Sequence, residues 1–173
     1  MSVLVAYASK YGATQGIAER IAEKLRAAGQ EAEARSVKAV GDPAGYDAYV
    51  IGSAAYMGSW LKEATEFVRR NRSFLADRPV WLFGSGPLGT EPLDAQGRDL
   101  RESAVPKEIA EFREAIGPRD HRVFFGAVTR GKFGFVHRIV AMMPASSTLL
   151  PEGDFRDWED IDSWAESIAR ELS

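Results

Sequence analysis

The chain has 173 residues, a formal net charge of −3 at pH 7 and 45% hydrophobic residues, the composition of an ordinary soluble globular domain. It contains no cysteine, which excludes disulfides, iron–sulfur clusters and thiolate zinc sites, and its two histidines, His121 and His137, are too few for a histidine-rich metal site. The mild charge gives no electrostatic case for a nucleic-acid partner.

The chain starts directly with an apolar run rather than a signal segment, and no apolar run approaches the ~18 residues of a membrane span. We therefore expect a single domain, 1–173, located in the cytoplasm.

Hydrophobic patterns predict alternating strands and helices along the chain. The first strand is predicted at Val3–Tyr7, and the helix that follows it at Ala13 to about Ala28. Further strands are predicted at 31–37, 47–52, 79–84 and 122–128, and further helices at 59–75 and 158–172, the last with Asp157 as its N-cap. The stretch 87–119 is long, polar and slightly acidic, and no element is predicted in it.

Strands that are continuous apolar runs and alternate with helices are typical of a parallel sheet covered on both faces. Five strands in this length fit an α/β doubly wound sheet of order 2-1-3-4-5. Ligands of such sheets bind at the carboxyl ends of the strands where the strand order reverses, here between strands one and three. The loops after strands one, three and four are therefore expected to converge on one site.

The loop after the first strand, 9–14, has the features of an anion pocket. Backbone N–H groups at a helix start are unsatisfied, and the helix dipole favours negative charge there. Ser9 and Thr14 add hydroxyl donors, and Gly12 lets the backbone approach a phosphate closely. The loop lacks Gly-Lys-Ser/Thr and the glycine spacing of a dinucleotide fingerprint. The alternative is an ordinary loop with a threonine in the first helical turn.

The other two loops offer backbone access and flat apolar surfaces. The loop 52–60 consists of small residues with Tyr56 and Trp60, whose faces suit contact with an aromatic ring system. The loop 84–90 holds three glycines and a proline, and is suited to backbone hydrogen bonds with ring carbonyls and nitrogens. The alternative for each is a glycine-rich turn after a buried strand.

Together these patterns resemble the flavodoxin family, and in detail they are similar to the flavodoxin-type, menaquinone-dependent protoporphyrinogen oxidases and their relatives. The resemblance spans nearly the whole chain and implies a flavodoxin-like fold with FMN as cofactor. It is carried by the loop 9–14, the block 50–58, the tripeptide 125–127, the helix start 157–159 and the insertion 129–156.

The resemblance also implies which residues bind the cofactor. The FMN phosphate would lie on Ser9, Lys10, Tyr11, Gly12, Ala13 and Thr14. The isoalloxazine ring would lie between Ser53, Ala54, Ala55, Tyr56, Met57, Gly58 and Trp60 on one side and Ser85, Gly86, Pro87, Leu88 and Gly89 on the other. No residue is identified as a catalytic acid or base, and His137 is interpreted as a surface histidine.

The activity implied is that of an FMN-dependent oxidoreductase, passing electrons from a reduced substrate to a quinone or another acceptor. The loop after the fourth strand has no aromatic residue from 84 to 92, which leaves one ring face open and suits an enzyme. The alternatives are a flavodoxin-like electron carrier, which the mild net charge disfavours, and a protein that binds a deazaflavin on the same loops. The acidic stretch 87–119 disfavours a porphyrinogen substrate, because the negatively charged propionates of a porphyrinogen would be expected to bind to basic residues.

The segment 131–143 combines basic with apolar residues. Such a segment fits peripheral contact with a membrane surface, a quinone or an acidic partner, and the alternative is a helix packed at the sheet edge with solvated arginines. The sequence leaves open whether the chain forms a homodimer.

Overall fold

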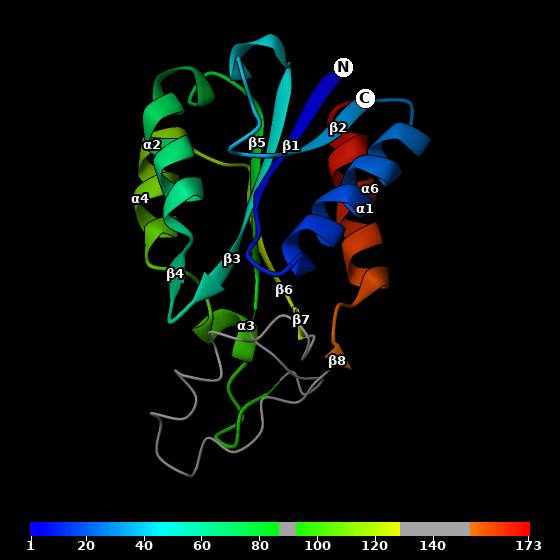
Figure 1. The fold of residues 1–173 in the computed structure, drawn as a ribbon. Helices are drawn as coiled ribbons and strands as arrows, with labels where there is room; N and C mark the ends of the chain where they lie inside the picture. Colours follow the sequence, from blue (N-terminus) through cyan, green and yellow to red (C-terminus); the bar gives the residue numbers. More distant parts are fainter. Residues whose placement is uncertain (87–92, 129–152) are drawn as a thin grey trace.

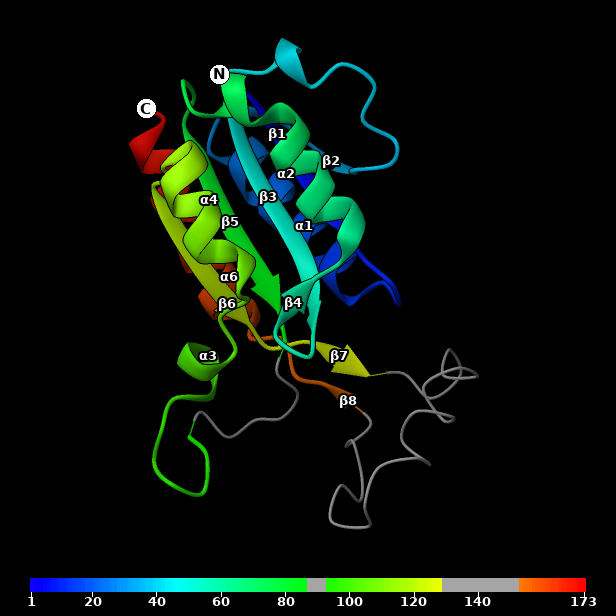
Figure 2. The ribbon, with the colours of Figure 1, turned by 90° about the vertical axis from the view of Figure 1, so that its left-hand side faces the viewer.

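The computed structural model describes residues 1–86, 93–128 and 153–173. Its centre is a parallel sheet of order β2-β1-β3-β5-β6 with helices on both faces (Figures 1 and 2). This confirms the predicted order 2-1-3-4-5, because a short additional strand, β4, shifts the numbering. The strands of the sheet are β1 (Ser2–Ala8), β2 (Glu31–Ser36), β3 (Ala48–Tyr56), β4 (Ser59–Trp60), β5 (Val80–Ser85) and β6 (Asp120–Phe124).

Helices cover both faces of the sheet, which explains why its central strands are apolar throughout (Figure 1). Val3, Leu4 and Val5 are consecutive in β1 and all fully buried. The pair α1 and α6 covers one face, and the pair α2 and α4 covers the other (Figure 1). These helices are α1 (Ala13–Ala27), α2 (Lys62–Leu75), α4 (Glu108–Ile116) and α6 (Trp158–Glu171), and the shorter ones are η1 (Pro43–Gly45) and α3 (Leu100–Ser103).

Large aromatic side chains fill the core under α6. The rings of Phe83 and Trp164 meet edge to face at 6.2 Å between centroids, and Phe124 packs on both. A Cβ atom on Gly52 would overlap the Phe83 ring. The glycine at the middle of β3 therefore makes room for the aromatic residue opposite it on β5.

The predicted start of the second helix at Ser59 is wrong, because Ser59 and Trp60 form a strand. β3 continues to Tyr56, turns back through Met57 and Gly58, and pairs antiparallel with β4. Both turn residues have positive φ, 51° and 75°, as a two-residue type I′ hairpin turn requires. The helix α2 therefore begins only at Lys62.

The predicted fifth strand, 122–128, is split in two by the structure. β6 ends at Phe124, and β7 (Ala127–Val128) leaves the sheet to pair with β8 (Gly153–Asp154). Within 87–119, where no element was predicted, the structure has α3 and α4. The predicted third strand, 47–52, is too short, because β3 continues to Tyr56, where it pairs with β4. The remaining predicted boundaries agree to within about one residue, and Asp157 caps α6 by accepting a hydrogen bond from the Asp160 backbone N–H.

The parallel strands all end at one edge of the sheet, which lies at the bottom of Figure 1. The elements α3, β4, β7 and β8 gather there, whereas both chain termini lie at the opposite end (Figure 1). Among the described helices, none is long and apolar enough to cross a membrane.

Candidate functional site

The loop between β1 and α1 forms an uncapped helix start. Gly12 is the N-cap, at φ 95° and ψ −9°, a left-handed conformation that only glycine adopts readily. Its N–H donates to Ser9 Oγ at 3.0 Å, which folds the loop back on itself. Among the described residues no side chain caps α1, and no acidic residue lies in its first turn. The positive end of the helix dipole is therefore available to an anion.

Thr14 provides direct support for an anion at this helix start. The residue is 1% exposed, and in the part of the chain that the structure describes its Oγ1 has no hydrogen-bond partner. A buried hydroxyl without a partner costs about 1–3 kcal/mol. A phosphate oxygen at the start of α1 would remove that cost, so the loop fits the phosphate that the sequence predicts.

Lys10 extends from the first loop to the second. Its ammonium nitrogen lies 5.5 Å from the centroid of the Tyr11 ring and 5.7 Å from that of Tyr56, both within cation–π range. The two loops meet because β1 and β3 are neighbours and Ala8 pairs with Ser53. The expected convergence of these two loops is confirmed.

Two residues predicted to bind the ring, Ser53 and Trp60, have structural roles in the fold. The buried Ser53 hydroxyl donates to Ala54 O at 2.8 Å and accepts from Leu61 N–H at 3.0 Å, which ties β3 to the start of α2. Trp60 is 4% exposed and packs against Phe112 of α4, with ring centroids 5.4 Å apart. Its face is covered, so Trp60 is a core residue.

The exposed part of the second loop is the tip of the β3–β4 hairpin. Tyr56 is 44% exposed and Met57 is 94% exposed. Partial burial, with a smaller contribution from Tyr11, raises the pKa of Tyr56 to about 12, so its phenol is neutral at pH 7. Of the two predicted aromatic faces, Tyr56 is the one that is accessible.

The third loop begins against the second. Ser85, the last residue of β5, is buried and pairs with Ala54. Gly86 has φ 135°, its N–H donates to Phe124 O at 2.9 Å, and a Cβ built on it would lie 3.5 Å from Ala55 O. The loop after β5 thus starts beside the end of β3. Several predicted residues lie outside the described part: Pro87, Leu88, Gly89, His137 and the segment 131–143.

Arg156 lies beside the phosphate loop, although sequence reasoning did not select it. Its Nη1 donates to Ala13 O at 3.4 Å, its guanidinium lies 4.5 Å from the Trp158 ring centroid, and Nη2 pairs with Asp154 at 2.5 Å. A Cβ on Gly16 would clash with this guanidinium. Ala13 and Arg156 are 143 positions apart in the sequence, so no local motif could reveal the contact.

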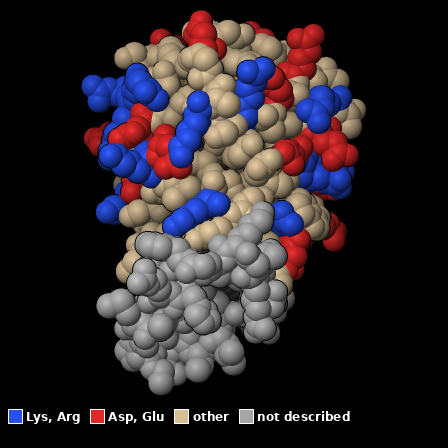
Figure 3. Space-filling view, in the orientation of Figure 1, with Lys and Arg blue, Asp and Glu red and all other residues tan. Residues whose placement is uncertain are grey.

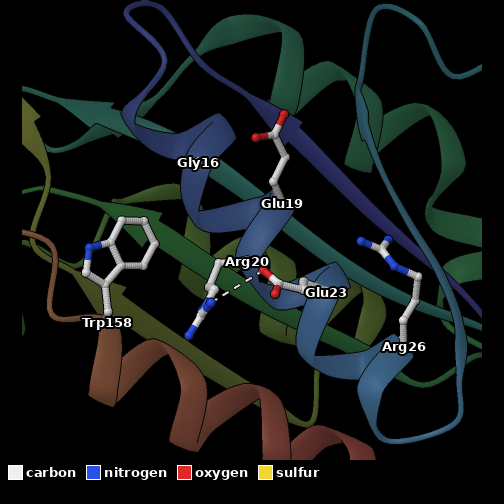
Figure 4. Close-up of a pocket in the computed structure, with 6 residues that line it drawn as sticks. All are labelled: Gly16, Glu19, Arg20, Glu23, Arg26 and Trp158. Carbon is white, nitrogen blue, oxygen red and sulfur yellow. Dashed lines mark hydrogen bonds and ion pairs between the residues drawn. The ribbon is translucent and has the colours of Figure 1, made fainter.

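A hollow of about 630 Å³ lies on the outer side of α1 (Figure 4). It is lined by residues of α1, from Gly16 to Arg26, and by Trp158 at the start of α6 (Figure 4). Its cations are engaged: Arg20 makes two 2.7 Å hydrogen bonds to Asp162, and Arg26 donates to a backbone carbonyl at 2.8 Å. The hollow is open and runs along the outer side of α1 from Gly16 in its first turn to Arg26 in its last turn, outside the converging loops, so we do not assign it to the cofactor.

Charges on the described surface are mixed in sign. In Figure 3, lysines and arginines alternate with acidic residues over both flanks of the visible face. Among the described residues no group of three or more His, Asp or Glu side chains is placed to hold a metal ion. His121 lies near the start of β6, away from the carboxyl edge.

Comparisons with known proteins agree with this geometry. The family model of the flavodoxin domain matches residues 4–149. Protoporphyrinogen IX dehydrogenase [quinone] of Escherichia coli is 23% identical over 98% of this chain and 95% of its own. An archaeal flavodoxin superposes with a TM-score of 0.62 at 17% identity, and a cysteine-to-serine mutant of Pseudomonas aeruginosa flavodoxin with 0.60 at 20%, each covering 99% of both chains.

Proposed function

Because the chain belongs to the flavodoxin family, which indicates FMN as its cofactor, we propose that it is an FMN-dependent oxidoreductase. It would pass electrons from a reduced substrate to a quinone or another acceptor. The observation that carries the proposal is the buried, unpartnered hydroxyl of Thr14 at an uncapped helix start. The likeness to the E. coli enzyme over nearly the full length of both chains adds support.

We assign the FMN phosphate to residues 9–14, where the first N–H groups of α1 and the Thr14 hydroxyl donate to it. The ring is assigned to the space bordered by Tyr56–Gly58 and by the loop that starts at Ser85. FMN, when bound, supplies the two-electron chemistry. The chain anchors the phosphate, presents the exposed face of Tyr56, and keeps side chains away from the ring at Gly58 and Gly86.

An enzyme fits the sequence of the third loop better than a carrier does. Residues 84–92 contain no aromatic side chain that could cover the second face of the ring. A substrate would need that face to be open. The mild formal net charge of −3 also disfavours a carrier, because carriers commonly steer toward their partners with a strongly charged face.

Although the acidic stretch 87–119 disfavours it, we propose a porphyrinogen as the donor and a quinone as the acceptor, following the activity for which the E. coli relative is named. The test is an anaerobic assay in which the FMN-loaded protein is mixed with protoporphyrinogen IX and a menaquinone analogue. Porphyrin fluorescence should appear only with both protein and quinone. Thr14→Val should lose activity at low FMN and regain it at saturating FMN. Failure with several quinones and porphyrinogens would overturn the enzyme assignment.

A flavodoxin-like electron carrier is the second candidate, since family membership fits it equally well. Anaerobic reductive titration separates the two. Direct two-electron reduction supports the enzyme, whereas two well-separated one-electron steps support the carrier. A deazaflavin with a phosphate-bearing tail would use the same loop, and competition between FMN and such a deazaflavin decides which of them this loop prefers.

A further inference from the structure

Lys10 is placed to act on the ring end of the FMN site. Its ammonium lies between the rings of Tyr11 and Tyr56, so the side chain leaves the phosphate loop and reaches the β3–β4 hairpin. This position lies beside Tyr56, the accessible aromatic face of the second loop.

Lys10 supplies the only charge that the sequence of the first two loops contains. Within residues 9–14 and 53–60, Lys10 is the one charged side chain, and the first turn of α1 adds no acid. Tyr56 is neutral at pH 7, as a phenol with an ordinary pKa near 10 already is, and burial raises its pKa further, to about 12. The two loops therefore present a positive field toward a ring that lies against Tyr56.

The positive charge of Lys10 affects the two redox forms of FMN differently. Oxidised FMN accepts two electrons and one proton to give the anionic reduced form, FMNH⁻, so the ring gains a negative charge. A fixed cation beside a partly buried ring attracts the charged form more strongly than the neutral form. We propose that Lys10 strengthens the binding of reduced FMN more than the binding of oxidised FMN and so raises the reduction potential of the bound cofactor. This inference rests on the proposed function.

The proposal is tested with Lys10→Met, which keeps the length of the side chain and removes its charge. Dissociation constants of oxidised and dithionite-reduced FMN are measured anaerobically for wild type and variant. The ratio of the dissociation constants of reduced and oxidised FMN should rise about five- to tenfold, the size expected when one partly screened charge beside the ring is removed. For a two-electron couple, a tenfold shift corresponds to a potential about 30 mV lower.

Two variants control for the fold and for net charge. Lys10→Arg retains the cation and should keep the ratio near the wild-type value. Lys62→Met changes the net charge equally at a side chain that is 85% exposed and paired with Glu66, and it should leave the ratio unchanged. Thermal unfolding of each apoprotein checks that the fold is intact.

Riboflavin separates a ring effect from a phosphate effect, because it carries the ring without the phosphate. A ring-directed Lys10 shifts the reduced-to-oxidised ratio for riboflavin as well as for FMN. If Lys10 acts on the phosphate alone, Lys10→Met would weaken the binding of oxidised and reduced FMN by the same factor and leave the binding of riboflavin unchanged. That result would overturn the inference.

The role of Tyr56 in holding the lysine is tested by a double-mutant cycle with Tyr56→Leu. Lys10→Met should have a smaller effect on the ratio in the Tyr56→Leu background, and full additivity would contradict the cation–π arrangement. If wild-type protein binds FMN but Lys10→Met leaves the ratio unchanged, the inference fails and the proposed function stands. If wild-type protein does not take up FMN, both fail.

Discussion

The backbone N–H of Lys107 donates a 3.0 Å hydrogen bond to the carbonyl oxygen of Gly58, so the start of α4 holds the tip of the β3–β4 hairpin. The next residue, Glu108, is 8% exposed, and its Oε2 accepts from the Trp60 N–H at 3.3 Å. Consecutive residues at the start of α4 thus hold the hairpin turn and the strand β4 that follows it. The position of the proposed ring contact depends on this connection.

Replacing Gly58 with valine should strain that hairpin. Gly58 has φ 75°, which costs a branched residue roughly 1–2 kcal/mol, although a Cβ there would meet no neighbouring atom. We expect Gly58→Val to lower the free energy of unfolding by about 1–2 kcal/mol and to weaken FMN binding. Gly58→Asn is the matched control, since asparagine tolerates positive φ, and it should stay close to wild type. Normal flavin content in the valine variant would place the ring elsewhere.

Thr14→Val should separate stability from binding. The Thr14 hydroxyl is buried without a partner among the described residues, so an isosteric methyl group should leave the apoprotein as stable as before or more stable. FMN binding should weaken by roughly 1–3 kcal/mol, the cost of a lost hydrogen bond to a charged group. Calorimetric titration with FMN and riboflavin measures this, and riboflavin affinity should not change. An unchanged FMN affinity would contradict the phosphate assignment.

Gly52→Ala tests the packing beneath the second loop. The added methyl would overlap the Phe83 ring, which is itself enclosed by aromatic neighbours. Overpacking of this kind costs roughly 1–3 kcal/mol or more. Gly45→Ala, at a glycine with no atom near its Cβ position and no positive φ, should stay within about 0.5 kcal/mol of wild type. Equal stability of the two variants in urea unfolding would show that β3 and β5 pack differently.

Acid should destabilise the protein partly through His121. Burial, assisted by Arg113 and opposed by Asp120, lowers the pKa of His121 to about 4, and its Nε2 has no partner among the described residues. In the unfolded chain the imidazole of His121 binds a proton below about pH 6.5, whereas in the folded chain it binds one only near pH 4. The neutral His121 therefore makes its full contribution to the free energy of unfolding above pH 6.5. That free energy falls by about 3 kcal/mol as the pH is lowered to 4.

Urea unfolding at several pH values between 7 and 4 measures that loss. His121→Asn removes the titrating group, so its free energy of unfolding should depend less on pH in this range. Carboxylates with lowered pKa values, such as Asp162 beside Arg20, also stabilise the folded state, and their protonation reduces the free energy of unfolding mainly at lower pH. Parallel pH profiles for wild type and variant would contradict the assignment to His121.

The sheet could be predicted because a buried parallel strand carries its signal in its own residues. Apolar runs such as Val3–Tyr7 need no knowledge of their partners. The helix α4 was missed although Ile109, Phe112 and Ile116 follow a helical spacing, because the polar residues around them dominated the interpretation. The hairpin was missed because its turn is Met57-Gly58, and methionine is not a typical residue for positive φ.

Side-chain roles in the site were harder to predict than the loops. Tyr56 and Trp60 look equivalent in sequence, yet α4 covers one and leaves the other 44% exposed. Ser53 could serve a ligand or a strand end, and the choice depends on where Leu61 lies. Contacts such as that between Ala13 and Arg156 arise only when the chain folds. Local patterns therefore identify the binding loops, whereas tertiary packing decides which side chains reach the ligand.

The most direct test of the account is the binding of FMN and riboflavin to the purified apoprotein, followed by flavin absorbance and fluorescence. One FMN should bind tightly to each chain with quenched fluorescence, and riboflavin should bind much more weakly because it lacks the phosphate. Thr14→Val should narrow the difference in affinity between the two flavins. A protein that leaves the fluorescence of both flavins unchanged, or binds them equally well, would contradict a phosphate-anchored flavin at the carboxyl edge of the sheet.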